Sequence, residues 1–331
     1  MIITKTPFRM SFFGGGTDLE SFFRDNGGAV ISTTIDKYCY VTVRHLPPFF
    51  DYSTELAYSK MERVKNTDDI IHPAVRNAMK MLDMHNIRLT YEADLPARSG
   101  LGTSSSFAVG MLNAFYCLKG KYADKKRLAD EAIYLERNLC EEDGGWQDQI
   151  AASFGGMNRI EFNVNGTYEV KPIIIHPKRK NRLNDNLLLF FTGFTRSSSD
   201  MQKANKAGYK EKTAQLKELY HLVDSAQNIL EDEQADLDDF GRLLDKSWKL
   251  KRQTGGAITT SSVDSIYEKG IKAGALGGKL LGAGGGGFMI FYVRPENKES
   301  VKEAMKDLLY VPFSFEDSGS QVIHYSPESY E

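Results

Sequence analysis

The chain has 331 residues, of which 41% are hydrophobic and 26% are charged, a composition typical of globular proteins with room for two domains. Its formal net charge of −2 excludes an overall basic field that would attract the protein to nucleic acid or an anionic membrane. The three cysteines lack metal-ligand spacing, so we expect a reducing, cytoplasmic setting. Apolar runs are only strand-sized, and the first residues lack the layout of a signal peptide, so we expect no membrane segment.

Hydrophobic periodicity predicts interleaved strands and helices in the amino-terminal half. Two β-branched runs flank Asp36 and Lys37, which resemble the two-residue loop of a hairpin. The expected elements, in chain order, are strands at 9–13, 29–35 and 38–44, a helix within 68–85, a strand at 87–91, helices at 103–119 and 124–141, a short helix after residue 145, and strands up to about residue 175.

The basic, proline-containing stretch 176–182 is interpreted as a solvated linker, which divides the chain into domains at 1–180 and 181–331. Beyond it we expect a strand at 187–191, amphipathic helices at 199–231 and 236–252, a helix at 261–274, a glycine-framed turn, a strand at 288–293, a helix at 297–309 and two closing strands. The early hairpins favour an antiparallel α+β fold over a doubly wound parallel sheet.

Three glycine-rich stretches occur at residues 14–18, 100–106 and 282–287. The second has the chemistry of a phosphate site, because glycines let backbone N–H groups turn toward an anion and hydroxyls follow as donors or Mg²⁺ ligands. An apolar helix follows directly, so its free N–H groups and the positive end of its dipole would point at the same place. We therefore expect the phosphates of a nucleoside triphosphate at the start of that helix.

Two familiar phosphate motifs do not fit this chain. The P-loop requires Ser or Thr after its Gly-Lys pair, whereas Leu280 follows Lys279. Gly282, Gly284 and Gly287 match the dinucleotide fingerprint, but a strand-like segment follows where that motif requires a helix. Consecutive glycines are costly to order, so we expect this backbone to approach a ligand or another loop closely.

Together, the three stretches resemble the motifs of a known family. Residues 96–106 resemble the central ATP-binding motif of the GHMP small-molecule kinases, residues 6–18 the first motif and residues 279–288 the third. The resemblance implies an α+β protein with an amino-terminal domain like domain 2 of ribosomal protein S5 and a ferredoxin-like carboxy-terminal domain. ATP would lie between the two, with Lys279 and the last glycine run closing over the site.

The resemblance also implies which residues hold ATP and Mg²⁺. The expected ATP-binding residues are Pro96, Arg98, Ser99, Gly100, Leu101, Gly102, Thr103, Ser104, Ser105, Ser106, Gly284, Gly285 and Gly286. Ser104 or Ser105 and Glu136 match the family's Mg²⁺ ligands, and one hydroxyl with one carboxylate suffices because Mg²⁺ also keeps phosphates and water. Without the resemblance, Glu136 would be an ordinary exposed helix acid.

Phosphoryl transfer needs a held γ-phosphate, an oriented hydroxyl and an acceptor for its proton. Asp148 matches the family's catalytic aspartate, which would accept the proton of the sugar's anomeric hydroxyl; the alternative is a helix N-terminal acid stabilised by the dipole. Arg9 matches the cation that partners this aspartate, and a guanidinium at that place would keep the carboxylate ionised. The alternative for Arg9 is a surface residue on an edge strand.

The resemblance of the first motif, residues 6–18, indicates the class of substrate. This motif most resembles the sugar-1-kinase branch that acts on D-glycero-D-manno-heptose 7-phosphate, whereas galactokinases have a Gly-Glu-His-Thr-Asp version. Asp18 would grip sugar hydroxyls, the alternative being an N-cap for the next helix. The expected contacts to the sugar are Gly15, Gly16, Thr17 and Asp18, and those to a second phosphate are Lys37, Arg98 and Arg196.

The sequence thus predicts an ATP- and Mg²⁺-dependent kinase that converts this heptose 7-phosphate to the 1,7-bisphosphate for nucleotide-activated heptose synthesis. One alternative is a sugar 1-kinase acting on fucose, galactose or an N-acetylhexosamine. Another is a catalytically silent sensor of sugar and ATP, against which the joint presence of Asp148, Arg9 and Glu136 argues. The expected partner is a small-molecule sugar phosphate, with no nucleic acid or membrane, and a homodimer stays open.

Overall fold

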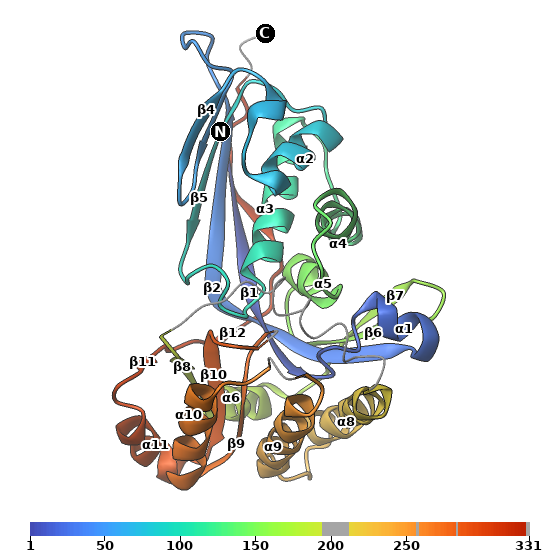
Figure 1. Ribbon diagram of the computed structural model, residues 1–331, viewed down its shortest axis with the longest axis vertical. Helices are drawn as coiled ribbons and strands as arrows, with labels where there is room; N and C mark the ends of the chain where they lie inside the picture. Colours follow the sequence, from blue (N-terminus) through green and yellow to red (C-terminus); the bar gives the residue numbers. More distant parts are fainter. Residues whose placement is uncertain (194–211, 256–257, 283, 329–331) are drawn as a thin grey trace.

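The computed structural model describes residues 1–193, 212–255, 258–282 and 284–328, and within these ranges the chain forms a nine-stranded and a four-stranded sheet. The first sheet contains β1 (Ile2–Phe13), β2 (Gly28–His45), β3 (Thr54–Ala57), β4 (Met61–Val64), β5 (Ile87–Ala93), β6 (Asn158–Phe162), β7 (Tyr168–Pro172), β12 (Phe315–Glu316) and β13 (Gln321–Tyr325). The second contains β8 (Leu187–Phe191), β9 (Ala275–Leu280), β10 (Phe288–Val293) and β11 (Leu309–Tyr310). In Figure 1 the second sheet lies below the first.

The strand pairs confirm the expected antiparallel α+β fold. The order of the first sheet is β13-β1-β2-β5-β3-β4, and of its described pairs only β3 with β5 is parallel. The second sheet has the order β11-β8-β10-β9, and its described pairs are all antiparallel. The interleaved helices therefore do not wind a parallel sheet.

The hairpin expected at Asp36 and Lys37 is wrong, because β2 continues through both residues as one strand of 18 residues. Their neighbours Ile35 and Tyr38 oppose adjacent residues of β1, so the pair bulges out of the ladder. A tight two-residue hairpin needs positive φ, and neither Asp36 nor Lys37 has it. The long strand pairs with β6 along its first half and with β5 along its second.

Helices cover one face of the first sheet (Figure 1). They are α2 (Pro73–Met81), α3 (Thr103–Leu118), α4 (Lys125–Tyr134) and α5 (Gln147–Phe154), with α1 (Glu20–Asn26) beside β6 and β7. α3 is buried almost all round, as its continuous apolar sequence requires. Directly after α4 the chain widens into a π-helical turn, η2 (Leu135–Leu139).

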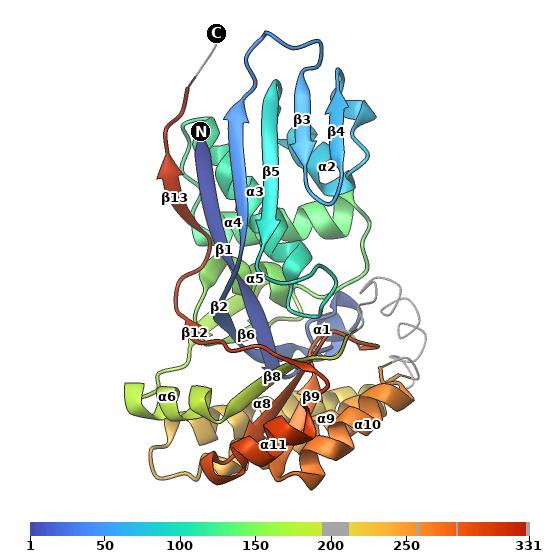
Figure 2. The same ribbon diagram turned by 90° about the vertical axis from the view of Figure 1, so that its left-hand side faces the viewer.

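The second half contributes the helices at the lower end of the molecule (Figure 2). They are α6 (Pro177–Asp185), α8 (Thr213–Glu231), α9 (Asp238–Arg252), α10 (Ser261–Lys272) and α11 (Lys298–Ala304). α9 and α10 pack against β9 of the small sheet, whereas α8 packs against α9 and against β1 and β2 of the first sheet. The stretch 176–182, expected as a solvated linker, is mostly exposed, but nearly all of it lies in α6 and not in a loop. Arg179 donates to the carbonyl oxygens of Ile229 and Leu230 at the end of α8 and of Ala235 just after it, so this arginine satisfies the carbonyl groups of a helix terminus.

The glycine-framed turn expected between the helix at 261–274 and the strand at 288–293 occupies only the second part of that interval, because β9 occupies the first part. A Cβ atom at Gly277 would lie 2.0 Å from the carbonyl oxygen of Gly241 in α9. The absence of a side chain at Gly277 therefore lets α9 and β9 pack closely. Composition alone does not distinguish such a glycine from one in a turn.

The two halves share a hydrophobic core and a sheet. Phe12 and Phe13 of β1 meet Phe240 of α9 edge to face, with ring centroids 5.3 Å and 5.1 Å away. β12 and β13 pair with β2 and β1, so the last strands belong to the first sheet, across the division expected at residue 180. None of the helices in the described part of the chain is long and apolar enough to cross a bilayer.

The last glycine run is expected to lie close to a ligand or to another loop, and its close approach to another loop is confirmed. A Cβ atom at Gly282 would lie 2.4 Å from Cα of Gly100, and one at Gly287 would lie 2.2 Å from the carbonyl oxygen of Ser99. The central and third motifs therefore touch backbone to backbone, and glycine is required on both sides of the contact.

Replacing Gly100 with alanine is expected to lower the free energy of unfolding by about 3 kcal/mol or more. Its φ is +83°, and an added Cβ atom would lie 2.3 Å from the carbonyl oxygen of Leu281. Gly120→Ala is the matched control, because Gly120 has φ of +65° with nothing within 4 Å of the added atom, so only about 1–2 kcal/mol should be lost. Urea unfolding measures both, and equal losses would contradict the tight contact.

Candidate active site

An open cavity lies where the three glycine-rich stretches meet. Its walls come from β1, the turn before α1, the loop before α3, the η2–α5 region, α9 and β9. The lining residues are Arg9, Ser11, Gly15, Gly16, Asp18, Leu19, Arg98, Gly100, Gly102, Thr103, Ser104, Ser105, Glu136, Arg137, Glu142, Asp143, Gly144, Gly145, Gln147, Asp148, Lys251, Thr254, Lys279 and Gly282. The charged side chains of both halves therefore converge on one space.

Arg9 and Asp148 form a bidentate ion pair at the centre of this cavity. Nε of Arg9 donates to Oδ1 of Asp148 over 2.8 Å, and Nη2 donates to Oδ2 over 2.7 Å. Nη1 donates to the carbonyl oxygen of Gly100 over 2.7 Å, so the same guanidinium also holds the central glycine loop. Arg9 is 4% exposed on a strand between β13 and β2, which rules out a surface arginine on an edge strand. Asp148 lies in the first turn of α5.

Glu136 lies in the π-helical turn η2 and is buried, with 1% exposure, so it is not an ordinary exposed helix acid. Ser104 donates to its Oε1 over 3.0 Å, and Ser105 donates to its Oε2 over 2.7 Å. Gln149 and Arg137 also donate to Oε2. The π-helical turn moves the carboxylate to the start of α3, which agrees with the frequent occurrence of such turns at functional sites.

Asp18 joins the first glycine turn to the start of α5. Its Oδ1 accepts from the N–H of Gly16 over 3.0 Å, and its Oδ2 accepts from the N–H of Gln147 over 3.4 Å. Leu19 is the N-cap of α1, so Asp18 does not cap that helix. Burial raises the pKa of Asp18 above its ordinary value, and the charge of Asp148 adds to the effect.

Two lysines of the second half complete the wall. Lys279 of β9 donates to the carbonyl oxygens of Ser11 and Phe12 over 2.9 Å and 2.8 Å, and burial lowers its pKa well below the ordinary range. Lys251 of α9 donates to the carbonyl oxygen of Gly282 over 2.8 Å. Burial lowers the pKa of Lys251 to about 8.

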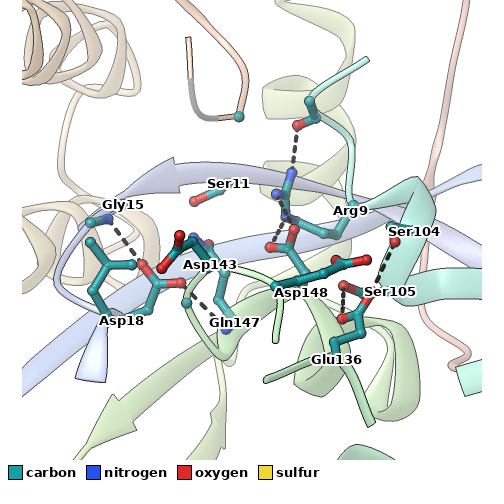
Figure 3. Close-up of a pocket in the computed structure, with 18 of the residues that line it drawn as sticks. Arg9, Ser11, Gly15, Asp18, Ser104, Ser105, Glu136, Asp143, Gln147 and Asp148 are labelled. Carbon is teal, nitrogen blue, oxygen red and sulfur yellow. Dashed lines mark hydrogen bonds and ion pairs between the residues drawn. The ribbon is translucent and has the colours of Figure 1, made fainter. Parts of the chain in front are cut away.

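The cavity has a definite order of groups. Figure 3 shows Arg9 and Asp148 in the middle, with Asp18 on one side and Ser104, Ser105 and Glu136 on the other. A donor held by the start of α3 and an acceptor held by Asp18 would therefore meet at Asp148. Such an arrangement would hold two bound molecules next to each other at one carboxylate.

Six residues expected to bind the nucleotide line the cavity: Arg98, Gly100, Gly102, Thr103, Ser104 and Ser105. The other four residues of the central motif support the loop or point away: Ser99 and Leu101 are buried, Ser106 donates to the carbonyl oxygen of Pro7 over 2.9 Å, and Pro96 is exposed. Gly284, Gly285 and Gly286 are not part of the described lining; the N–H of Gly285 donates to Ile258 over 3.1 Å.

Of the residues expected to contact the sugar, Gly15, Gly16 and Asp18 line the cavity. Thr17 does not, because its hydroxyl holds the glycine turn by donating to the carbonyl oxygens of Gly14 and Ala29. Lys37 lies in the bulge of β2, where it pairs with Asp36 at 2.9 Å, and is likewise absent from the described lining. Arg196 falls outside the described residues.

The sequence interpretation missed Ser11, Gln147, Glu142 and Lys251, all of which line the cavity. For Lys251 a signal exists. The buried residues of α9 include Phe240, Leu244 and Trp248, and position 251 continues that stripe with helical spacing. A lysine that continues an apolar stripe indicates a cation turned toward the interior.

Comparisons with known proteins agree with this geometry. The models of the GHMP kinase N-terminal and C-terminal domains match residues 69–156 and 225–311. The D-glycero-alpha-D-manno-heptose 7-phosphate kinase of Campylobacter jejuni is 30% identical over 331 residues, which cover 96% of this chain and 97% of that protein. A crystal structure of a D-glycero-D-manno-heptose 1-phosphate kinase from Bacteroides thetaiotaomicron has a TM-score of 0.79 and 25% identity over 98% of this chain and 99% of that one.

A third relative differs in length. The L-fucokinase/L-fucose-1-P guanylyltransferase of Bacteroides fragilis is 27% identical over 373 residues, which cover 96% of this chain but 38% of that protein. The fold and the converging glycine motifs are thus those of a phosphotransferase with an alcohol group as acceptor. The chain belongs to the GHMP kinase family, and within it to the sugar kinases.

Proposed function

We propose that this sugar kinase transfers the γ-phosphoryl group of ATP to the anomeric hydroxyl of D-glycero-D-manno-heptose 7-phosphate. The product would be the 1,7-bisphosphate, an intermediate for nucleotide-activated heptose. The bidentate pair of Arg9 and Asp148, set between the start of α3 and Asp18, is the observation that carries the proposal. The Campylobacter relative named for a heptose 7-phosphate supports the choice of acceptor.

The start of α3 suits the phosphates of ATP. Gly102 precedes the helix in a left-handed conformation with φ of 73°, and no described side chain caps the helix. The first N–H groups of a helix lack intrahelical partners, and the dipole favours an anion there. Arg98 lines the same part of the cavity and adds a positive charge.

The donors around Glu136 fit Mg²⁺. A carboxylate and the two hydroxyls of Ser104 and Ser105 are hard oxygen ligands, which this ion prefers. The described residues contain no cluster of three or more His, Cys, Asp or Glu, so phosphates and water would complete the coordination. Burial and, to a smaller extent, the charge of Glu136 raise the pKa of nearby Glu142, while the charges of Arg137 and Arg98 oppose this shift. When bound, Mg²⁺ would neutralise charge on the β- and γ-phosphates.

Asp148 would act on the acceptor. As the anomeric oxygen forms its bond to the γ-phosphorus and the bond to the ADP oxygen breaks, the hydroxyl proton passes to Asp148. Arg9 fixes the carboxylate by two hydrogen bonds and keeps two N–H groups that could face the transferring oxygen atoms. A carboxylate beside a guanidinium is a weak base, which suffices when the transition state is loose and the proton leaves late.

A second acceptor class has support of its own. The fucokinase relative covers 96% of this chain at 27% identity, so an unphosphorylated 6-deoxyhexose is the main competitor. The kinase of known structure from Bacteroides thetaiotaomicron is named for a heptose 1-phosphate, which also makes the acceptor the point to test.

A panel assay of ADP formation tests the proposed acceptor. The panel contains D-glycero-D-manno-heptose 7-phosphate, its unphosphorylated parent, fucose, galactose, N-acetylhexosamines and hexose 6-phosphates. We expect kcat/KM with the heptose 7-phosphate to exceed that of every other sugar, and ³¹P NMR to place the new phosphate on C1. Turnover of fucose or galactose without turnover of the heptose phosphate would assign the enzyme to the other class.

A further inference from the structure

Lys251 is a cavity-lining cation without a place in the chemistry described so far. It lies near the end of α9, and its Nζ atom donates to the carbonyl oxygen of Gly282 over 2.8 Å. An ammonium group has three N–H donors, so this bond leaves two of them available to the cavity. Glycine at position 282 is in turn packed against Gly100 of the central loop.

The surroundings of Nζ locate it at the acceptor end. A Cβ atom on Gly15 would lie 3.6 Å from Nζ of Lys251 and 3.8 Å from Oγ of Ser11. Nζ of Lys251 and Oγ of Ser11 therefore both lie beside Gly15 in the first glycine turn. Ser11 is 5% exposed, and its hydroxyl has no hydrogen-bond partner among the described residues. A buried hydroxyl of this kind indicates a ligand that completes its bonding.

We propose that Lys251 is a substrate-binding residue that donates hydrogen bonds to hydroxyl or ring oxygens of the acceptor sugar above Gly15, with Ser11 as a neighbouring partner. The inference rests on the proposed acceptor site at Asp18. A sugar hydroxyl both accepts and donates, so it can accept from Lys251 and donate to a carboxylate. A residue from the second half of the chain would thereby contact the sugar directly.

The charges around Lys251 favour a neutral group of the sugar over its distal phosphate. Asp18 from the glycine turn and Asp148 from α5 act on it as negative charges, while Arg9 of β1 and Lys279 of β9 act as positive ones. A phosphate at this place would meet both carboxylates, whereas a hydroxyl fits between an ammonium group and a carboxylate. The distal phosphate would therefore lie elsewhere.

If Lys251 served only to stabilise the fold, removing its charge should lower the stability of the unliganded protein. Its buried position predicts the opposite. Burial lowers its pKa to about 8, so near neutral pH the folded protein holds a charge that its environment disfavours. Between pH 8 and the ordinary pKa of a lysine, the unfolded chain binds more protons, and stability rises with pH. Removing the charge should therefore leave the unliganded protein as stable as the wild type or more stable.

The experiment compares Lys251→Met with Lys251→Arg and with Lys249→Met, whose lysine is exposed on the same helix and pairs with Asp245. The acceptor is the sugar that the wild type turns over best in the panel. For Lys251→Met we expect KM of the sugar to rise at least about tenfold and KM of ATP to change less than about twofold. The sugar-induced rise in unfolding temperature should disappear, and Lys249→Met should behave as the wild type.

The pH profile provides a readout that a structural role would not move. In the wild type, kcat/KM for the sugar should fall as pH rises above about 8, because Lys251 then loses its charge. Lys251→Met should lack this limb, and Lys251→Arg should keep part of the affinity without the limb because arginine stays protonated. The sugars that the wild type turns over identify the acceptor class. The role of Lys251 is tested separately, by the ratio of the sugar KM of the variant to that of the wild type. An unchanged sugar KM, or equal losses for sugar and ATP, would overturn the inference.

Discussion

Asp148→Asn is expected to lower kcat by roughly a thousandfold, the usual size of the loss when a positioned general base is removed. Asparagine keeps the shape of the side chain but cannot accept the proton of the attacking hydroxyl. It also turns an amide N–H₂ group toward Arg9, whose Nε and Nη2 donate to the two carboxylate oxygens of the wild type. Steady-state kinetics should show the loss in kcat, with KM for ATP nearly unchanged.

Stability must be measured beside activity in this variant, because a weakened ion pair to Arg9 could disturb the central loop through Gly100. Asp130→Asn is the matched control: Asp130 pairs with Lys126 on the outer side of α4, away from the cavity lining. It should retain wild-type kcat. Near-normal turnover by a folded Asp148→Asn protein would remove the proposed base and reopen the hypothesis of a silent sensor.

The sequence predicted which residues lie at the centre of the cavity better than it predicted the cavity walls. The glycine turn before α3 could be found because it carries a local signature of residue type and spacing, whereas Asp148 is expected from the resemblance to the family. The approach of the third glycine run to another loop could also be predicted, since glycine is costly unless a close contact requires it. These features depend on short stretches of chain.

The remaining features depend on tertiary pairing, which short stretches do not encode. Lys37 matched a charge requirement, but the bulge of β2 turns it toward Asp36. β13 pairs with β1 across almost the whole chain length, and no local pattern identifies such a partner. Glu136 is buried in the π-helical turn that follows α4. The apolar periodicity over 124–141 predicts one continuous helix and does not reveal this turn.

Glu136→Gln is expected to weaken the response to Mg²⁺ most strongly among the variants considered. The change removes one negative charge from the proposed ligand set while keeping its size. We expect the Mg²⁺ concentration for half-maximal activity to rise at least about tenfold and kcat at saturating Mg²⁺ to fall roughly a hundredfold. Titration of activity with Mg²⁺ at fixed total ATP measures both.

The hydrogen bonds of Glu136 create an alternative explanation that a control must separate. Its carboxylate accepts from Ser104, Ser105, Gln149 and Arg137, and an amide has one acceptor oxygen, so the variant should also lose about 1–3 kcal/mol of stability. Glu131→Gln gives the comparison, because Glu131 of α4 accepts from Tyr116 of α3 and from Arg127 of α4, outside the cavity lining. It should lose stability without a shift in the Mg²⁺ titration. If Glu136→Gln also loses only stability, Glu136 is a structural acceptor for the two serines, and the metal must be sought at another part of the cavity.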